Sequence, residues 1–157
     1  MDISAGNGTT FRVADSGDHG LVVRLLGELV DELGPPPTAG VVKSKLEADI
    51  ERALANENVR IFLAEQKGEA LGLSRADILI NDPIFRLRAD VRCGYVDQMY
   101  VRPSYRGKGI GRELLKLCEE WFREHGLGHC LLHAAPKAVR FYAEKGYQAN
   151  RQMFKRL

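Results

Sequence analysis

Apolar residues in the first third of the chain recur every three or four positions, which is the spacing of an amphipathic helix. One such stretch, at 21–33, follows a short alternating strand at 11–15. The prolines of the GPPPT segment at 34–38 end this helix, because proline cannot donate a helical hydrogen bond. A second stretch of the same period occupies 38–55, where Thr38 can cap its start. We therefore expect a strand followed by two helices.

The middle of the chain has the apolar, β-branched and alternating character of strands. Two strands at 59–65 and 70–80 flank the sequence QKGE, which predicts a hairpin turn through Gly68. The segment 81–92 has mixed signals and is expected to be a loop. A further strand is predicted at 93–101. These elements together indicate a strand meander in the centre of the fold.

Strands and helices alternate in the last third of the chain. A helix begins near Gly109 and is closed by the glycines of 125–128. A buried strand at 129–135, a short helix at 137–146 and a last strand at 152–157 follow. This order of elements predicts a mixed α/β sheet with helices on its faces.

Length and composition restrict the possible classes of protein. A chain of 157 residues suits one domain, which we place at 9–157 after a disordered tail at 1–8. A net charge of +2 is too small to indicate nucleic acid or an anionic membrane as the main partner. The sequence has no apolar run long enough to span a bilayer and no secretory signal at its start. We therefore expect a cytoplasmic protein without nucleic-acid or membrane partners.

The cysteines give no sign of a disulfide framework or a nucleophile. Cys93, Cys118 and Cys130 form no CxxC pair, and none has a motif-defined base beside it. A reducing compartment is the default for such a chain.

The segment SYRGKGIGRELL, at 104–115, places glycines and cations at a junction of strand and helix. Its alternating residues are Arg106, Gly107, Lys108, Gly109, Gly111 and Arg112. A helix start presents N–H groups without partners, and glycines let phosphate oxygens approach the backbone, so the turn is expected to bind an anion. Neither a Walker A motif nor the dinucleotide pattern GxGxxG fits the spacing. A turn that is rich in glycine for packing alone is the alternative.

Two motifs resemble those of the GNAT superfamily of N-acyltransferases. VDQMYVRPSYRGKGIGRELL is similar to the family's acyl-CoA-binding signature, with Arg106, Gly109 and Gly111 at the defining places. AVRFYAEKGY, at 138–147, is similar to the family's last conserved helix. The two matches cover about 94–147 and occur in the family's order.

The resemblance implies a single GNAT-like α/β domain with a mixed, mostly antiparallel sheet that splays open at the cofactor strand. It also implies acetyl-CoA as the co-substrate, with pantetheine beside that strand and pyrophosphate on the glycine turn. The coenzyme-binding residues implied are Met99, Tyr100, Val101, Arg106, Gly107, Lys108, Gly109, Ile110, Gly111, Arg112 and Tyr142.

The resemblance also suggests catalytic roles. Tyr142 matches the family's general acid, and a phenol that titrates near pH 10 can donate a proton at neutral pH. Asp97 stands where many relatives carry Glu and is the candidate base, acting through water, or else a solvated or salt-bridged carboxylate. By strand alternation it shares a face with Tyr95 and Met99, whose N–H is the implied oxyanion donor. Phe141 is expected in the core, although both aromatic residues could pack there.

Two features bear on metal and coenzyme contacts. His125, His129 and His133 are spaced by four, but glycines interrupt any helix at the first two, and on a strand the last two lie too far apart to share an ion. No metal is therefore expected, and His133 is read either as lining the amine pocket or as an ordinary, partly buried histidine. Ala135 stands where relatives often have Asn, so one side-chain contact to the coenzyme is missing or replaced.

We therefore expect direct transfer of an acetyl group from acetyl-CoA to a primary amine of a small molecule or peptide, within a ternary complex. Glu28, Asp31, Glu32 and Asp82 are expected near the acceptor and favour a cationic amine, although a solvated acidic helix face explains the first three equally well. A homodimer is a further expectation. The alternatives are an acyl-CoA-binding sensor of the same fold without turnover and a nucleotide-binding protein.

Overall fold

The computed structural model describes residues 3–4, 8–33, 39–80 and 92–149. The strands are β1 (Ile3–Ser4), β2 (Thr10–Val13), β3 (Val59–Gln66), β4 (Glu69–Ile80), β5 (Arg92–Val101) and β6 (Cys130–Leu132). The α-helices are α1 (His19–Glu32), α2 (Ala39–Leu54), α3 (Ile110–Glu124) and α4 (Val139–Ala143), with short 3-10 helices at Ser16–Asp18, Pro103–Tyr105 and Pro136–Ala138.

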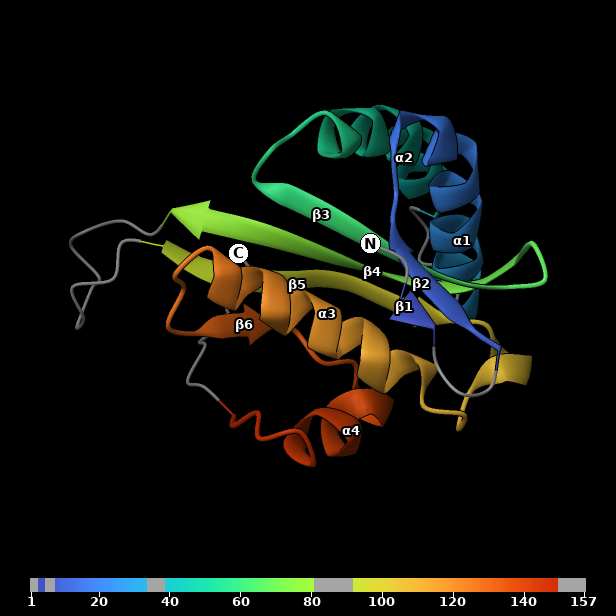
Figure 1. Cartoon of the computed structure of the whole chain (residues 1–157). Coiled ribbons are helices and arrows are strands. Elements are labelled where there is room, and N and C mark those ends of the chain that lie inside the picture. The colour runs from blue at the N-terminus through green and yellow to red at the C-terminus, as the bar shows by residue number, and fades with distance from the viewer. Residues whose placement is uncertain (1–2, 5–7, 34–38, 81–91, 150–157) are drawn as a thin grey trace, which may run out of the picture.

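The six strands form one sheet in the order of the sequence, β1-β2-β3-β4-β5-β6 (Figure 1). Each neighbouring pair from β1 to β5 is antiparallel, whereas β5 and β6 are parallel. The prediction of a mixed, mostly antiparallel sheet is therefore confirmed.

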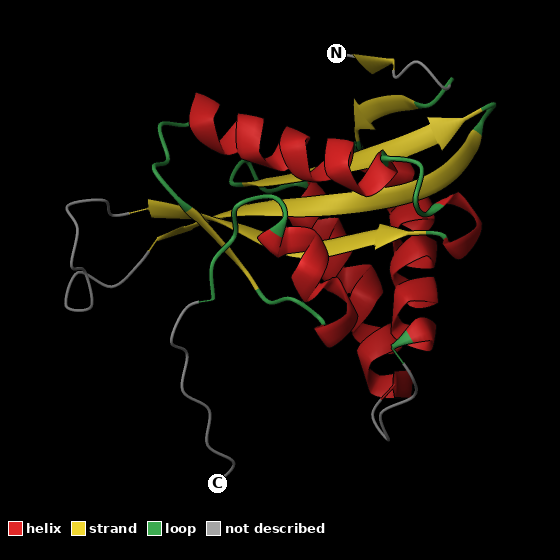
Figure 2. Ribbon diagram, turned by 90° about the horizontal axis from the view of Figure 1, so that it is seen from below, coloured by secondary structure: helices red, strands yellow, loops and turns green. Residues whose placement is uncertain are grey.

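Helices cover both faces of the sheet, as predicted (Figures 1 and 2). On β3, Ile61 and Leu63 pack with α1 and α2, whereas Phe62 and Ala64 pack in the cluster formed with α3. This alternation arises because successive side chains of a strand point to opposite faces. Both clusters consist mainly of aliphatic and aromatic side chains that are almost fully buried, so the sheet is the central layer of a three-layer fold.

One extra residue interrupts the regular alternation of β5. Val96 pairs with Ala76 and Gln98 pairs with Arg75, which leaves Asp97 without a register partner on β4. Such a bulge reverses the direction of the side chains that follow it. The prediction that Asp97 and Met99 share a face is therefore wrong.

The faces on either side of the bulge show this reversal. Val96, before it, packs in the cluster on the α3 side of the sheet. Tyr100, four residues later, packs with α1 and α2, and Met99 and Val101 pack on the α3 side. Strict alternation would have put Val96 and Tyr100 on the same face.

The sheet also opens after this bulge, on the edge of β5 that faces β6. β6 pairs with β5 only from Gly94 to Val96, opposite Cys130–Leu132. Within the described residues, the part of β5 from 97 to 101 has no strand beside it on that side, and Figure 1 shows β5 continuing past the end of β6. The predicted splay of the sheet at this strand is confirmed.

Some predicted boundaries differ from those of the structure. The buried strand predicted at 129–135 is only Cys130–Leu132, because β5 bends away after Val96 and leaves the following residues no partner. Its side chains are half-buried or exposed, since this strand is the edge of the sheet. The helix predicted at 137–146 becomes a 3-10 turn that starts at Pro136 and the five-residue α4. The strand predicted at 11–15 corresponds to β2, which ends at Val13.

Other predictions fall wholly or partly outside the described residues. The last strand, at 152–157, lies outside them, as does the expected loop except for Arg92, which begins β5. Within the expected tail at 1–8, Ile3 and Ser4 pair with Phe11 and Thr10. The domain boundary at residue 9 stays a prediction. Among the described helices, none has the length and apolar character needed to cross a membrane.

Close contact between β4 and β5 gives a direct test of this packing. A Cβ added at Gly72 would lie 2.4 Å from the carbonyl oxygen of Tyr100, a backbone atom that cannot move without shifting β5. Gly72→Ala should therefore lower the free energy of unfolding by about 1–3 kcal/mol, measured by urea denaturation. Gly27→Ala in α1, where a Cβ meets nothing within 4 Å, is the control and should stabilise the protein by about 0.5–1 kcal/mol. Equal unfolding energies for the two variants would contradict the predicted strand contact.

Candidate active site

The glycine turn leads directly into α3. Gly107 and Gly109 have φ angles of 75° and 85°, a left-handed region in which a Cβ is strained. Among the described residues, no side chain makes a cap hydrogen bond at Gly109, and Glu113 N–H donates to its carbonyl at 3.1 Å. The N–H groups of 110–112 therefore have no acceptor within the helix, and the dipole of α3 favours a negative charge beside them.

The three cations of the turn have different surroundings. Arg106 forms a two-point ion pair with Glu32, at 2.8 and 2.5 Å, and its Nε donates to the Val101 carbonyl at 2.7 Å. The Lys108 ammonium lies 5.1 Å from the centre of the Tyr105 ring. Arg112 is largely exposed, with Nε 3.6 Å from a carboxylate oxygen of Glu113. Lys108 and Arg112 are thus the cations at the exposed rim of the turn.

The backbone of Arg106 is also engaged. Its N–H donates to Pro103 O at 3.2 Å, which closes the 3-10 turn after β5. The first N–H group of the turn that is available to an anion is therefore that of Gly107.

The exposed edge of β5 continues this row. Arg102 N–H donates to Leu71 O on β4 at 2.9 Å. Because the N–H groups of a strand alternate in direction, Tyr100 also faces β4, whereas Met99 and Val101 face the side from which β6 has parted. The Val101 carbonyl confirms this direction, since it accepts from Arg106 rather than from β4. Two segments of backbone thus offer hydrogen-bonding groups to the same opening.

Asp97 lies at the bulge beside a buried arginine. Its Oδ2 accepts from Gln98 Nε2 at 2.6 Å and lies 3.6 Å from Arg75 Nη1. Arg75 is held more closely by Asp77 and Asp49, each at 2.8 Å. Burial raises the pKa of Asp97, Arg75 lowers it, and the charges of Asp77 and Asp49 raise it further, so that the net shift is upward. A carboxylate with a raised pKa is a stronger base than an ordinary one.

Tyr142 lies on α4, which packs against the start of α3. Burial, with a smaller contribution from Cys118, raises the pKa of Tyr142 to about 12, so the hydroxyl is protonated at neutral pH. Phe141 also packs against the α3-side cluster, and its Cζ would lie 3.8 Å from a Cβ at Gly111. Both aromatic residues are half-buried. The assignment of Phe141 to the core and Tyr142 to the cofactor therefore stays a prediction.

Two of the carboxylates that were expected near the acceptor form ion pairs with arginines of the protein. Glu28 forms a two-point ion pair with Arg102, at 2.7 and 2.9 Å, and Glu32 pairs with Arg106. Their charge is therefore balanced within the protein and gives no support to a cationic acceptor. Asp82 lies outside the described residues.

Comparison with known proteins decides the family. Residues 26–147 match the sequence profile of the acetyltransferase (GNAT) family. The chain belongs to the GNAT acetyltransferase family. A protein of Trypanosoma brucei brucei named glucosamine 6-phosphate N-acetyltransferase is 32% identical over 143 residues, which cover 90% of this chain and 91% of that protein.

Solved structures agree with this membership. A GCN5-related N-acetyltransferase from Ralstonia eutropha superposes with a TM-score of 0.87 at 25% identity, over 96% of this chain and 99% of that one. A predicted acetyltransferase from Clostridium acetobutylicum, solved with acetyl-CoA, has a TM-score of 0.83 at 23% identity, over 95% and 96% of the two chains. The likeness to the second structure concerns the fold. This GNAT chain is thus an acyl-CoA-dependent acetyltransferase.

Sequence reasoning missed the polar groups beside Asp97 in this acetyltransferase. Arg75, buried to 9% exposure, and Asp77 lie in an otherwise apolar strand, which was a usable signal because buried charges need partners. Tyr95 hydrogen-bonds His133 Nδ1, joining β5 to the end of β6 where the strands separate. His133 thus lies where the two strands separate, and it is exposed rather than partly buried. A place in the amine pocket stays a prediction. The described residues contain no cluster suited to a metal.

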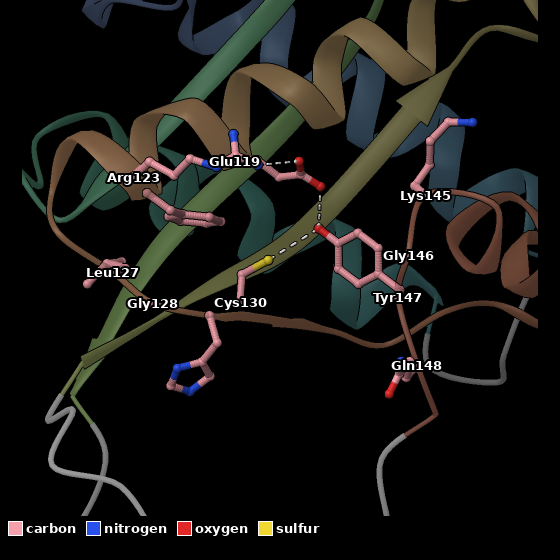
Figure 3. A pocket seen from close by; sticks show the side chains of 11 residues that line it. Glu119, Arg123, Leu127, Gly128, Cys130, Lys145, Gly146, Tyr147 and Gln148 are labelled. Atoms are coloured by element: carbon pink, nitrogen blue, oxygen red, sulfur yellow. Dashed lines mark hydrogen bonds and ion pairs between the residues drawn. The ribbon is translucent and has the colours of Figure 1, made fainter.

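A separate pocket of about 460 Å³ lies at the other end of α3 (Figure 3). Its polar centre is Tyr147, whose hydroxyl donates to Glu119 at 3.0 Å and lies 3.2 Å from Cys130 Sγ. Arg123 pairs with the same glutamate at 3.1 Å. None of the predicted site residues lines this pocket.

Titration of individual aspartates tests the charge environment of the site. The Asp97 carboxyl, followed by carbon-detected NMR, should titrate above the ordinary value of about 3.9, because burial disfavours its charged form. Asp18 is the internal control and should titrate below that value, since Arg12 donates to it. The charged form of Asp97 costs stability, so the melting temperature of Asp97→Asn relative to wild type should rise as the pH increases from about 4 to about 7. Titration of Asp97 below Asp18 would contradict the account.

Proposed function

We propose that the protein transfers an acetyl group from acetyl-CoA directly to a primary amine of a small molecule or peptide, with both substrates bound together. The observation that carries this proposal is the row of backbone groups that two neighbouring segments present at one opening. The row runs from the free edge of β5, at Met99 and Val101, to the uncapped start of α3. Coenzyme A, an extended molecule with amides at one end and phosphates at the other, matches this row of backbone groups.

Each part of the coenzyme has a complementary segment. Pantetheine amides pair with Met99 and Val101 as an additional strand would, while Tyr100 keeps its backbone bonds to β4. The pyrophosphate takes the N–H groups from Gly107 through Gly109 and Ile110 to Gly111 and Arg112. Lys108 and Arg112 add positive charge at the rim.

The reaction needs a free amine, a stabilised oxyanion and a proton for the thiolate. An alkyl ammonium titrates near pH 10, so Asp97 accepts its proton through a water molecule. The amine nitrogen attacks the thioester carbonyl carbon, and the Met99 N–H donates to the oxygen as negative charge develops there. The carbon–sulfur bond then breaks, and Tyr142 gives its proton to the departing sulfur. The nitrogen of the new amide loses its remaining extra proton, which restores the Tyr142 hydroxyl. The raised pKa values of Asp97 and Tyr142 suit these two roles.

The acceptor class that we test first is an amino sugar. The trypanosomal relative is named for glucosamine 6-phosphate, whose amine is primary. Because Glu28 and Glu32 are bound to arginines, they neither repel a phosphate nor attract an additional cation. Glucosamine and glucosamine 6-phosphate therefore head a panel that also holds a diamine and a short peptide.

Loss of the Tyr142 hydroxyl separates turnover from coenzyme binding. With the best amine of the panel, Tyr142→Phe should lower kcat by about 10²–10³-fold, because the thiolate then leaves without its proton donor. Its dissociation constant for coenzyme A should stay within about twofold of the wild type, since backbone groups carry most of that binding. Thiol release measures the first quantity and isothermal titration the second.

Tyr147→Phe is the matched control. It also removes a half-buried phenol, but from the pocket at the far end of α3, where the hydroxyl binds Glu119. Its kcat should equal that of the wild type. Equal loss of turnover in both variants, or none in Tyr142→Phe, would contradict the proposed role of Tyr142.

A further inference from the structure

The C-terminal half of α1 carries two glutamates one turn apart, and each forms an ion pair with an arginine that follows β5. Glu28 binds Arg102 through Nη2 at 2.7 Å and Nε at 2.9 Å. Glu32 binds Arg106 through Nη1 at 2.8 Å and Nη2 at 2.5 Å. Residues at i and i+4 of a helix lie on one face, so the two ion pairs are neighbours along the same face of α1. Together they fasten α1 to the segment that leads into the glycine turn.

The second of these pairs is attached to the turn itself. Arg106 stands immediately before Gly107, the first residue of the turn with a left-handed φ angle. Besides Glu32, its side chain binds the Val101 carbonyl at 2.7 Å, and its guanidinium lies 5.8 Å from the centre of the Tyr100 ring. Arg106 is therefore fixed to β5 on one side and to α1 on the other, at the point where the turn begins.

The ion pair between Glu28 and Arg102 is attached to β4 rather than to the turn. Arg102 lies directly after β5, and its third contact, from Nη1 to Ala70 O at 2.7 Å, is with β4. Breaking this pair loosens α1 from the sheet without releasing the residue that precedes Gly107. The chain thus offers two similar ion pairs on one helix, of which only one reaches the turn.

We infer that Glu32 is a positioning residue for the coenzyme, holding Arg106 so that the turn keeps its binding shape before the coenzyme arrives. This inference rests on the proposed function, because it concerns the same phosphate-binding turn. Fixing a loop in its bound conformation strengthens binding by removing the entropy cost of ordering it. Both side chains of the pair are more than 40% exposed, so it contributes little to global stability and its effect falls on the geometry of the turn.

A direct role for the Arg106 side chain as a phosphate ligand leads to the opposite expectation. In that case the guanidinium must leave Glu32 and Val101 O before it binds phosphate, and removing Glu32 would release it. Glu32→Gln would then strengthen coenzyme binding. The sign of the change in affinity therefore separates the two roles.

The experiment is isothermal titration of coenzyme A into the wild type, Glu32→Gln and Glu28→Gln. Glu32→Gln should bind about fivefold more weakly, the order of effect expected when an ordered ion pair is lost. Glu28→Gln, the matched control, should bind within about twofold of the wild type. The Arg102 side chain binds Glu28, Glu69 and the Ala70 carbonyl rather than the residues of 106–112. Melting curves should show that both variants fold and lose similar, small amounts of stability.

Steady-state kinetics supply the readout that a merely structural role would leave unchanged. In Glu32→Gln the KM for acetyl-CoA should rise by a similar factor, while kcat and the KM for the amine stay at wild-type values. Equal affinities in the two variants, or tighter binding by Glu32→Gln, would overturn the inference. Failure of the wild type to bind coenzyme A would instead overturn the proposed function.

Discussion

The extra residue at Asp97 is the constraint on which the rest of the site depends. It bends β5 away from β6 while β5 stays paired with β4, so the sheet opens on one side only. It also reverses the strand's faces, which buries Tyr100 against α1 and turns the free backbone groups of Met99 and Val101 toward the opening. Without the bulge, β6 could continue along β5 and satisfy those groups itself.

The proposed coenzyme surface is therefore built from backbone, and side chains hold it in place. The left-handed φ angles of Gly107 and Gly109 direct the chain from β5 into α3, whose first N–H groups stay uncapped. The ion pair between Glu32 and Arg106 ties this turn to α1. Backbone donors suit phosphates because they are fixed before the ligand arrives and pay little further ordering cost on binding. In the proposed mechanism the chemistry is carried by two titratable groups, Asp97 and Tyr142, whose pKa values are raised mainly by burial.

Local properties of the sequence predicted most of the fold. Apolar periodicity placed the main helices and strands, and the glycine turn was predicted because left-handed backbone and helix starts are local features. The bulge at Asp97 was not predictable in this way, because strand register depends on the partner strand. For the same reason the length of the strand at Cys130 was overestimated. The partners of Glu28 and Glu32 are arginines 74 positions away, and nothing in the helix sequence distinguishes such a pair from a solvated acidic face.

Backbone amide exchange, measured by NMR with and without saturating coenzyme A, tests the central claim most directly. The claim is that the free edge of β5 and the start of α3 form one coenzyme surface. The account predicts that coenzyme A slows exchange at Val101 and along 107–112. Tyr100 and Arg102, which already face β4, should exchange at unchanged rates. Unchanged exchange along 107–112, or slowing confined to another part of the chain, would contradict it.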